Sequence, residues 1–372
     1  MRQILKVIFV IFASAAPLMV RVPSAGAAEP FESVKPHKQP PGFSSLDISS
    51  SAAGIAMGAA CVADPYRVTS FRSNPAAFSD EPGVKGYYSR RFMDYLDSNR
   101  SMIYGQEACL YSTGAVINLG RVGLALDYTR LEQGRFESVS TIYTPQGALE
   151  GVFEPYWHTM TAALAADIYG GLKAGAAIKY HNRNYLPGYD YEGAYLFDLG
   201  IIYGLNGFFD RTTFNDHFCL GLSVQNTGGK LSYSNLGEIE LPRFLRLGFS
   251  YQLARRVESD EEMLRLLFAG EYRRYLNYDD REDDFDRDYY GFGIEGRLYQ
   301  WAYLRVGGGN DPVWGVENRF NPALGAGADI PFSGFGIDVP VDLKFDYTYL
   351  FLEDSEYDNI ISVSIGYNRS LI

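Results

Sequence analysis

Cysteine, tryptophan and basic residues are scarce in this sequence of 372 residues. Three Cys are too few for a disulfide scaffold, and 33 Lys+Arg against 45 Asp+Glu give a net charge of −12. An acidic chain without a dense basic tract binds nucleic acid poorly, because phosphates need Lys and Arg. Beyond the N-terminal thirty residues there is no apolar run of about 18 residues, which excludes a bundle of membrane helices. We therefore expect no nucleic-acid partner and no helical membrane domain.

Aromatic residues and glycine are abundant instead. Tyr, Phe and Trp number 29, 24 and 3, which is 15% of the chain, and there are 39 Gly. The mean hydropathy is nevertheless only −0.15. At about 150 residues per domain the length suggests two soluble domains, but single closed barrels also run this long.

The first 28 residues have the pattern of a signal peptide. Arg2 and Lys6 form a basic start, the uncharged run 7–20 follows, and small residues at 24–28 offer a cleavage site after Ala27 or Ala28. The run is about 14 residues long, too short for the ~20 that span a bilayer as a helix. We expect an exported protein without a lipid anchor, since no cysteine follows the cleavage site.

From about residue 84 the chain alternates between two kinds of side chain, as a β-strand with two different faces requires. In the segment 122–128, Leu124, Leu126 and Tyr128 alternate with Ala125 and Asp127. Across the segments, one face is large and often ends in Tyr or Phe, while the other is rich in Gly, Ala, Ser and charge. A sandwich core cannot hold so many ions, because each buried unpaired charge costs several kcal/mol. The pattern therefore predicts apolar residues outside and polar residues in a lumen, with the luminal charges paired to one another.

Counting these segments predicts an all-β fold, a transmembrane antiparallel β-barrel of about 14 strands over residues 84–372. The number is even, as in single-chain bacterial barrels with both termini in the periplasm. Long connections after odd-numbered strands place the long loops outside the cell. The predicted strands are 84–92, 109–119, 121–130, 158–169, 171–182, 191–204, 216–227, 242–253, 263–275, 286–298, 299–309, 319–330, 338–350 and 358–368.

Residues 29–83 do not alternate and form a separate predicted unit. The stretch 51–63 is made of small residues that pack tightly, and Asn74-Pro75 marks a turn. Placed directly before the first strand, this unit is expected to fill the lumen as an N-terminal plug or hatch. The alternative is a tail in the periplasm.

These residues resemble the FadL-type outer-membrane proteins, a family of long-chain fatty-acid and aromatic-hydrocarbon channels. The similarity lies in the Gly/Ala-rich stretch with Gly58, the Ala-Asp pair ending at Asp64, and Asn74-Pro75-Ala76 before the barrel. The resemblance implies a plug motif at these five positions. Other stretches, 223–228, 241–248, 304–307 and 344–349, look like the PorV-type branch of type IX secretion. The resemblance to these outer-membrane proteins implies localisation in the bacterial outer membrane, in contact with the lipid and lipopolysaccharide of that membrane.

No arrangement of residues indicates catalysis or a metal site. His37, His158, His181 and His217 are scattered without ligand spacing, and no Gly-x-Ser-x-Gly elbow occurs. We expect no enzyme activity, no cofactor and no metal, and we expect the three cysteines to be free thiols. The acidic run 279–288 lacks the pattern of an EF-hand and is expected to be a solvated loop.

Two functions remain open. The first is passage of small hydrophobic compounds, in which loop aromatics line a ligand pocket; the candidates are Tyr143, Phe153, Tyr156, Trp157 and Trp314. The second is a PorV-like, non-catalytic scaffold or shuttle component that binds a secreted or periplasmic protein. A hydrophobic ligand is the expected partner in the first case, and a protein in the second.

Overall fold

The computed structural model describes most of the predicted barrel and part of the predicted plug. The described residues are 46, 48–78, 82–93, 108–134, 136–137, 152–184, 191–206, 214–233, 237–256, 262–277, 288–299, 301–310, 320–332, 339–352 and 357–367. The signal peptide lies outside these residues, so its presence stays a prediction. The same holds for the bounds 29–83 of the plug.

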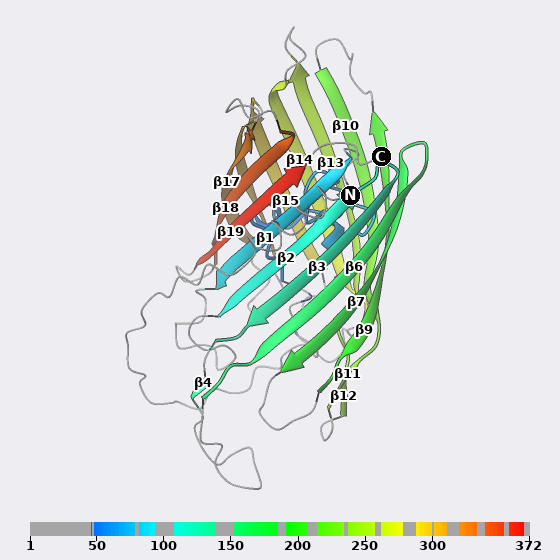
Figure 1. Cartoon of the computed structure of the whole chain (residues 1–372), viewed down its shortest axis with the longest axis vertical. Coiled ribbons are helices and arrows are strands. Elements are labelled where there is room, and N and C mark those ends of the chain that lie inside the picture. The colour runs from blue at the N-terminus through cyan, green and yellow to red at the C-terminus, as the bar shows by residue number, and fades with distance from the viewer. Residues whose placement is uncertain are drawn as a thin grey trace.

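Within the described residues, fourteen antiparallel strands form a closed barrel, as predicted (Figure 1). Each strand pairs with its neighbour along the chain, and β1 pairs with the last strand, β19, from Val84↔Tyr367 to Met93↔Asp358. Closure leaves no unpaired edge, which a membrane barrel requires. The strands are β1 (Gly83–Met93), β2 (Cys109–Asn118), β3 (Val122–Glu132), β6 (Tyr156–Tyr169), β7 (Leu172–Asn184), β9 (Ala194–Asn206), β10 (Phe214–Gly228), β13 (Phe244–Arg256), β14 (Glu262–Tyr275), β15 (Asp288–Leu298), β16 (Ala302–Asn310), β17 (Phe320–Pro331), β18 (Val341–Phe351) and β19 (Tyr357–Tyr367).

Short strands extend the wall at the end with the long connections. β4 (Phe136–Glu137) pairs with β5 (Val152–Phe153), and β11 (Leu231–Tyr233) pairs with both β8 (Tyr191–Glu192) and β12 (Gly237–Ile239). In Figure 1 these pieces lie beyond the ends of β3, β7 and β9. We call this the loop end of the barrel, and the opposite end the turn end.

Tight connections join strands at the turn end. Between β6 and β7, Gly170 and Gly171 have φ values of 58° and 85°. This left-handed backbone favours glycine, because a Cβ would be strained there. The sequence therefore fixes this hairpin locally.

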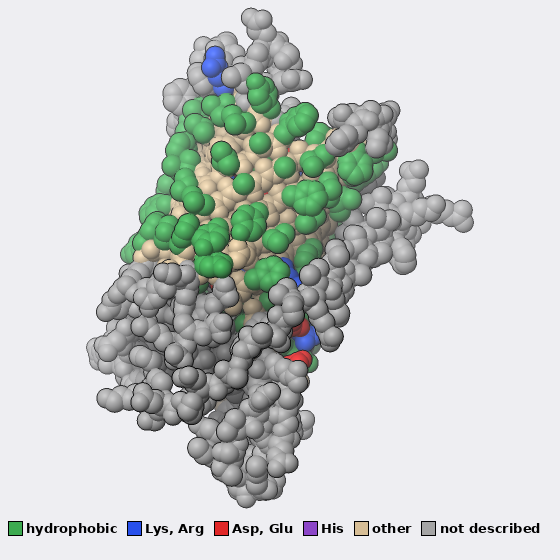
Figure 2. Space-filling view, turned by 90° about the vertical axis from the view of Figure 1, so that its left-hand side faces the viewer, with side chains coloured by type: hydrophobic (Ala, Val, Ile, Leu, Met, Phe, Trp, Pro, Cys, Tyr) green, Lys and Arg blue, Asp and Glu red, His purple; other side chains and the backbone are tan. Residues whose placement is uncertain are grey.

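The wall has an apolar outer face and a polar inner face, as the alternation predicts. On β3, Leu124 and Leu126 are 42% and 61% exposed, whereas Asp127 is 6% exposed. Figure 2 shows hydrophobic side chains across one side of the wall, with charged side chains only near its ends. Such an exterior is typical of a barrel in contact with lipid. In the described part of the chain, no helix is long and apolar enough to cross a membrane.

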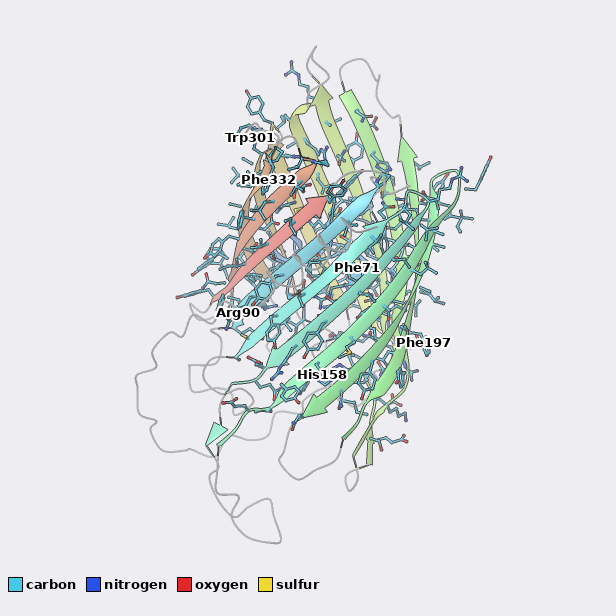
Figure 3. All side chains as sticks on the ribbon, in the orientation of Figure 1. Phe71, Arg90, His158, Phe197, Trp301 and Phe332 are labelled. Atoms are coloured by element: carbon cyan, nitrogen blue, oxygen red, sulfur yellow. The ribbon has the colours of Figure 1, made fainter. Side chains whose placement is uncertain are left out.

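Residues 48–78, which we call the luminal segment, pack against the inner face of the wall. The segment contains the short helix α2 (Ala52–Ile55), whose N-cap is Ser51, and the 3₁₀ turn η1 (Ser70–Arg72). Figure 3 shows Phe71 of this segment within the barrel, while Phe197 of β9 projects from the outside of the wall. Phe71 is 1% exposed and packs with Phe78 and with Ala125, Ala163 and Ala177 of the strands.

Candidate functional site: the luminal segment and two cavities

Glycines on the inner face let the backbone of the luminal segment approach the strands closely. A Cβ at Gly307 of β16 would lie 2.6 Å from the carbonyl oxygen of Ala56 and 2.7 Å from the amide nitrogen of Gly58. Gly58 itself has a φ of 64°, a left-handed conformation that glycine adopts without strain. Gly175, Gly221 and Gly293 lie in equivalent contact with the backbone of the segment, whereas Gly200 and Gly325 face the side chains of Asn74 and Ala56.

The Asn-Pro-Ala motif joins the luminal segment to the wall. The side-chain amide of Asn74 donates to the carbonyl oxygen of Val62 at 2.8 Å and to that of Ile201 on β9 at 3.0 Å. Its side-chain oxygen accepts a hydrogen bond from the amide of Ala76 at 3.0 Å. The carbonyl of Pro75 lies against Gly175 of β7. One fully buried side chain therefore fixes the fold of the segment and its position on the wall.

Glu271 of β14 provides a second attachment. One carboxylate oxygen accepts hydrogen bonds from the backbone amides of Cys61 and Val62, at 2.9 and 3.0 Å, and the other contacts Arg246 of β13 at 2.9 Å. A carboxylate with three donors is well satisfied, which offsets the cost of burying its charge.

A chain of buried ions forms the third attachment. Arg67 of the luminal segment pairs with Asp64 of the same segment and, at 3.0 Å, with Glu295 of β15. Glu295 also pairs with Arg305 of β16 at 2.6 Å, and Arg305 pairs with Asp346 of β18 at 2.7 Å. Asp64 and Arg67 therefore belong to the same network as three charges of the wall.

The predicted pairing of luminal charges is confirmed for further pairs. Arg91 and Asp358 are 2.6 Å apart, and Lys179 and Asp198 are also 2.6 Å apart, with all four side chains buried. Lys179 and Asp198 both contact Asn226, at 2.8 Å in each case. Asn226 lies at a β-bulge in β10 and has a φ of 58°. The bulge turns two consecutive side chains inward, which the alternation does not predict.

The stretches that resemble the PorV-type branch contribute to the interior of the wall. Asn226 donates to the carbonyl of Pro242 at 2.9 Å, and Arg305 pairs with Asp346. Asn226, Arg305 and Asp346 are 1%, 3% and 8% exposed. At these positions the motifs make contacts that hold the barrel together.

Among the cavities that the described residues line, two lie on either side of the luminal segment. The loop-side cavity measures about 100 Å³ and the turn-side cavity about 350 Å³. Some strands line both cavities with different residues. On β1, Arg91 lies nearer the loop end and lines the loop-side cavity, whereas Lys85 lies nearer the turn end and lines the turn-side cavity. On β18, Leu350 and Lys344 are divided in the same way. The luminal segment therefore divides the lumen into two compartments.

The two cavities differ in their lining. Apolar groups of Ile48, Ile55, Leu350 and Tyr289 line the loop-side cavity, together with hydroxyls and with six charged side chains: Arg72, Arg91, Lys179, Arg246, Arg273 and Asp127. The turn-side cavity is lined mainly by ions and hydroxyls, with nearly balanced charge: Arg67, Lys85, Arg265, Arg297 and Lys344 against Glu295, Asp329, Asp342 and Asp346. An apolar compound therefore fits the loop-side cavity better than the turn-side cavity.

The predicted loop aromatics are dispersed. Tyr143 and Trp314 lie outside the described residues, and Phe153 belongs to β5, where its backbone pairs with Phe136. Trp157 is 2% exposed and packs with Ile48 of the luminal segment, whereas Tyr156 stacks with His158 and lies under Arg130. Their role as a ligand pocket stays a prediction.

All three cysteines are free, as predicted, and the structure shows that they are buried. Burial raises the pKa of the Cys61 thiol to about 11, so this group is protonated at neutral pH. Within the described residues, no group of three or more His, Cys, Asp or Glu side chains is arranged to hold a metal ion. The absence of enzyme activity stays a prediction.

The barrel is similar in structure to solved toluene transporters and to a FadL homologue. The toluene transporter TbuX of Ralstonia pickettii shares 12% identity, with 87% of this chain and 98% of that chain covered and a TM-score of 0.48. The toluene transporter TodX of Pseudomonas putida has the same identity and TM-score, with 87% and 99% covered. A FadL homologue of Pseudomonas aeruginosa shares 10% identity over 86% of this chain and 98% of that chain, with a TM-score of 0.44. No family model matches the sequence, and no curated protein matches it.

Proposed function

We propose that this protein is an outer-membrane barrel that passes small hydrophobic compounds, which bind first in the loop-side cavity. The observation that carries this proposal is the mixed lining of that cavity, where Ile48, Ile55, Leu350 and Tyr289 offer an apolar surface within an otherwise polar lumen. A compound with an apolar body and a small polar group suits such a lining.

The volume of the loop-side cavity limits the size of the compound that can bind there. Its volume of about 100 Å³ is of the same order as the ~150 Å³ apolar cavity that binds benzene in another protein. A molecule of one ring or less is therefore the largest expected ligand while the luminal segment keeps its position. A long alkyl chain requires movement of this segment.

The apolar exterior supports the location in the outer membrane. Leu126, Phe197, Leu199 and Leu304 are each more than half exposed on the outside of the wall. In water, such an exposed apolar surface would cause molecules of this protein to associate, whereas in a membrane it contacts the apolar lipid chains.

Calorimetric titration of the detergent-purified protein with toluene tests the proposal. Ser49 lines the loop-side cavity, so Ser49→Phe is expected to fill it and abolish binding. Leu126→Phe adds a ring on the outside of the wall and is expected to leave binding unchanged. If wild-type protein binds no toluene, or if Ser49→Phe binds it as well as wild type, the proposal is wrong.

The scaffold alternative has less support. Its motif residues Asn226, Arg305 and Asp346 are buried in the wall, so they do not form a surface for a secreted or periplasmic partner. Co-purification of a stoichiometric partner would favour that alternative over the channel.

A further inference from the structure

We infer that a small polar solute can pass the luminal segment at one place, where the Ser51–Thr69 hydrogen bond closes a hydroxyl-lined seam. Ser51 and Thr69 are the two residues that line both the loop-side and the turn-side cavity. The Thr69 hydroxyl donates to the Ser51 oxygen at 2.9 Å. The barrier between the two compartments is therefore at its thinnest at this pair. The inference goes beyond the proposed function, because it concerns water and small ions instead of hydrophobic compounds.

Hydroxyl groups continue from this pair to the adjacent wall. Ser50 and Ser112 of β2 are hydrogen-bonded at 2.7 Å, and Ser89 of β1 and Ser362 of β19 at 2.6 Å. Ser89 also contacts the carbonyl of Ser50. β1, β2 and β19 thus face the luminal segment across small polar groups. We call these hydroxyls, together with Ser51 and Thr69, the hydroxyl seam.

The contact with the strands opposite is of another kind. There the backbone of the segment lies directly on glycines, as at Gly175, Gly221 and Gly307, where even an added Cβ would clash. Asn74 and Glu271 also attach the segment on that side. Separating these surfaces would break close packing and several buried hydrogen bonds together.

Arg72 also donates to the hydroxyls of Ser50 and Ser112, at 2.6 and 3.2 Å, and the amide of Ala52 donates to that of Ser362 at 3.0 Å, so the seam opens most easily at the Ser51–Thr69 bond. A hydroxyl that leaves another hydroxyl can bond to water instead, so the net loss per hydrogen bond is small. The turn-side cavity beyond it is polar, with five basic and four acidic lining residues, and can hold water.

Conductance of the full-length protein in planar bilayers, with KCl as the probe, tests this inference. Thr69→Val removes the hydroxyl at nearly constant volume, and Thr69→Ala also removes bulk. We expect Thr69→Val to raise the open fraction about fivefold, the change that corresponds to the loss of one hydrogen bond of ~1 kcal/mol. Thr69→Ala is expected to raise it further.

Ser70→Ala provides the matched control, since Ser70 is the next residue, is 1% exposed and lines neither cavity. We expect this variant to conduct like wild type. The inference is overturned if both Thr69 variants, folded as judged by heat-modifiable migration, conduct like wild type. It is also overturned if Ser70→Ala raises conductance equally, because the segment would then loosen as a whole. Toluene binding is measured separately, so failure of one proposal does not imply failure of the other.

Discussion

Replacing Asn74 by alanine should release the luminal segment from the wall without unfolding the barrel. The substitution removes two hydrogen bonds to the carbonyls of Val62 and Ile201 and one from the amide of Ala76. The bond to Ile201 of β9 and a longer one to Leu222 of β10, at 3.5 Å, reach the wall, whereas those with Val62 and Ala76 hold the fold of the segment itself. At about 1 kcal/mol for each bond, and more for partners left buried and unsatisfied, the folded and attached state of the segment should weaken by about 3–5 kcal/mol. The strand pairing itself is untouched, since Asn74 contributes none of it.

Hydrogen exchange in detergent measures this release directly. A loss of about 3 kcal/mol corresponds to roughly a hundredfold increase in the open population, and so in the exchange rate of the amides over residues 52–64. Asn74→Asp should act in the same direction, because a carboxylate cannot donate to the two carbonyls. Asn182→Ala, which removes a half-buried amide on β7, is the control. Exchange that stays at the wild-type rate in Asn74→Ala would refute the reasoning.

Three further predictions concern packing, ion pairing and pH. Gly307→Ala should destabilise the folded protein by about 1–3 kcal/mol through overpacking. Gly296→Ala should have little effect, since its Cβ would meet only a side-chain atom 3.9 Å away. The temperature midpoint of heat-modifiable migration measures the stability of both variants. Arg305→Met should cost about 3–5 kcal/mol in the same assay, because it removes the ion pair of buried Asp346 and one of the two guanidinium groups that contact buried Glu295, which keeps only Arg67. Lys230→Met, at an exposed site beside Glu238 and Glu240, should leave the midpoint unchanged. Equal effects of the two variants would contradict the role of burial. Cys61 should resist thiol reagents at pH 8 until the protein is denatured. Because burial raises the pKa of its thiol from 9.0 to about 11, the contribution of this group to the free energy of unfolding should be present below pH 9 and lost between pH 9 and 11. A Cys61→Ala variant that loses the same stability over this pH range would contradict this prediction.

The sequence predicts the strands well because the signal is local. Leu124 and Leu126 alternate with Ala125 and Asp127 within a few residues, and a strand must place such side chains on opposite faces. Gly170 and Gly171 mark a turn by their own backbone preference. Asn226 breaks the alternation, because a bulge adds a residue and turns a second polar side chain inward. Only the Asn-Thr-Gly stretch around it, typical of irregular backbone, hints at this.

The luminal site is predicted less completely. Asn74, Pro75, Gly58 and Asp64 were identified from the sequence, and the structure places all of them in contact with the wall or with residues that reach it. The hydrogen bonds of Glu271 to the amides of Cys61 and Val62 join residues far apart in the chain, and no sequence pattern predicts them. The hydroxyl seam carries no recognisable pattern, since serine and threonine occur at many inward positions.

The sequence by itself determined the barrel, its strand number and the polarity of its two faces. These properties follow from the period of two along each strand and from the cost of placing charge against lipid, and both act on neighbouring residues. The tertiary structure alone decided where the luminal segment attaches to the wall and where the barrier between the two cavities is thinnest. Cys61 and Glu271 are separated by 210 residues along the chain, and Ser89 and Ser362 by 273. Such contacts depend on closure of the barrel, which brings β1 beside β19 and which no local pattern specifies.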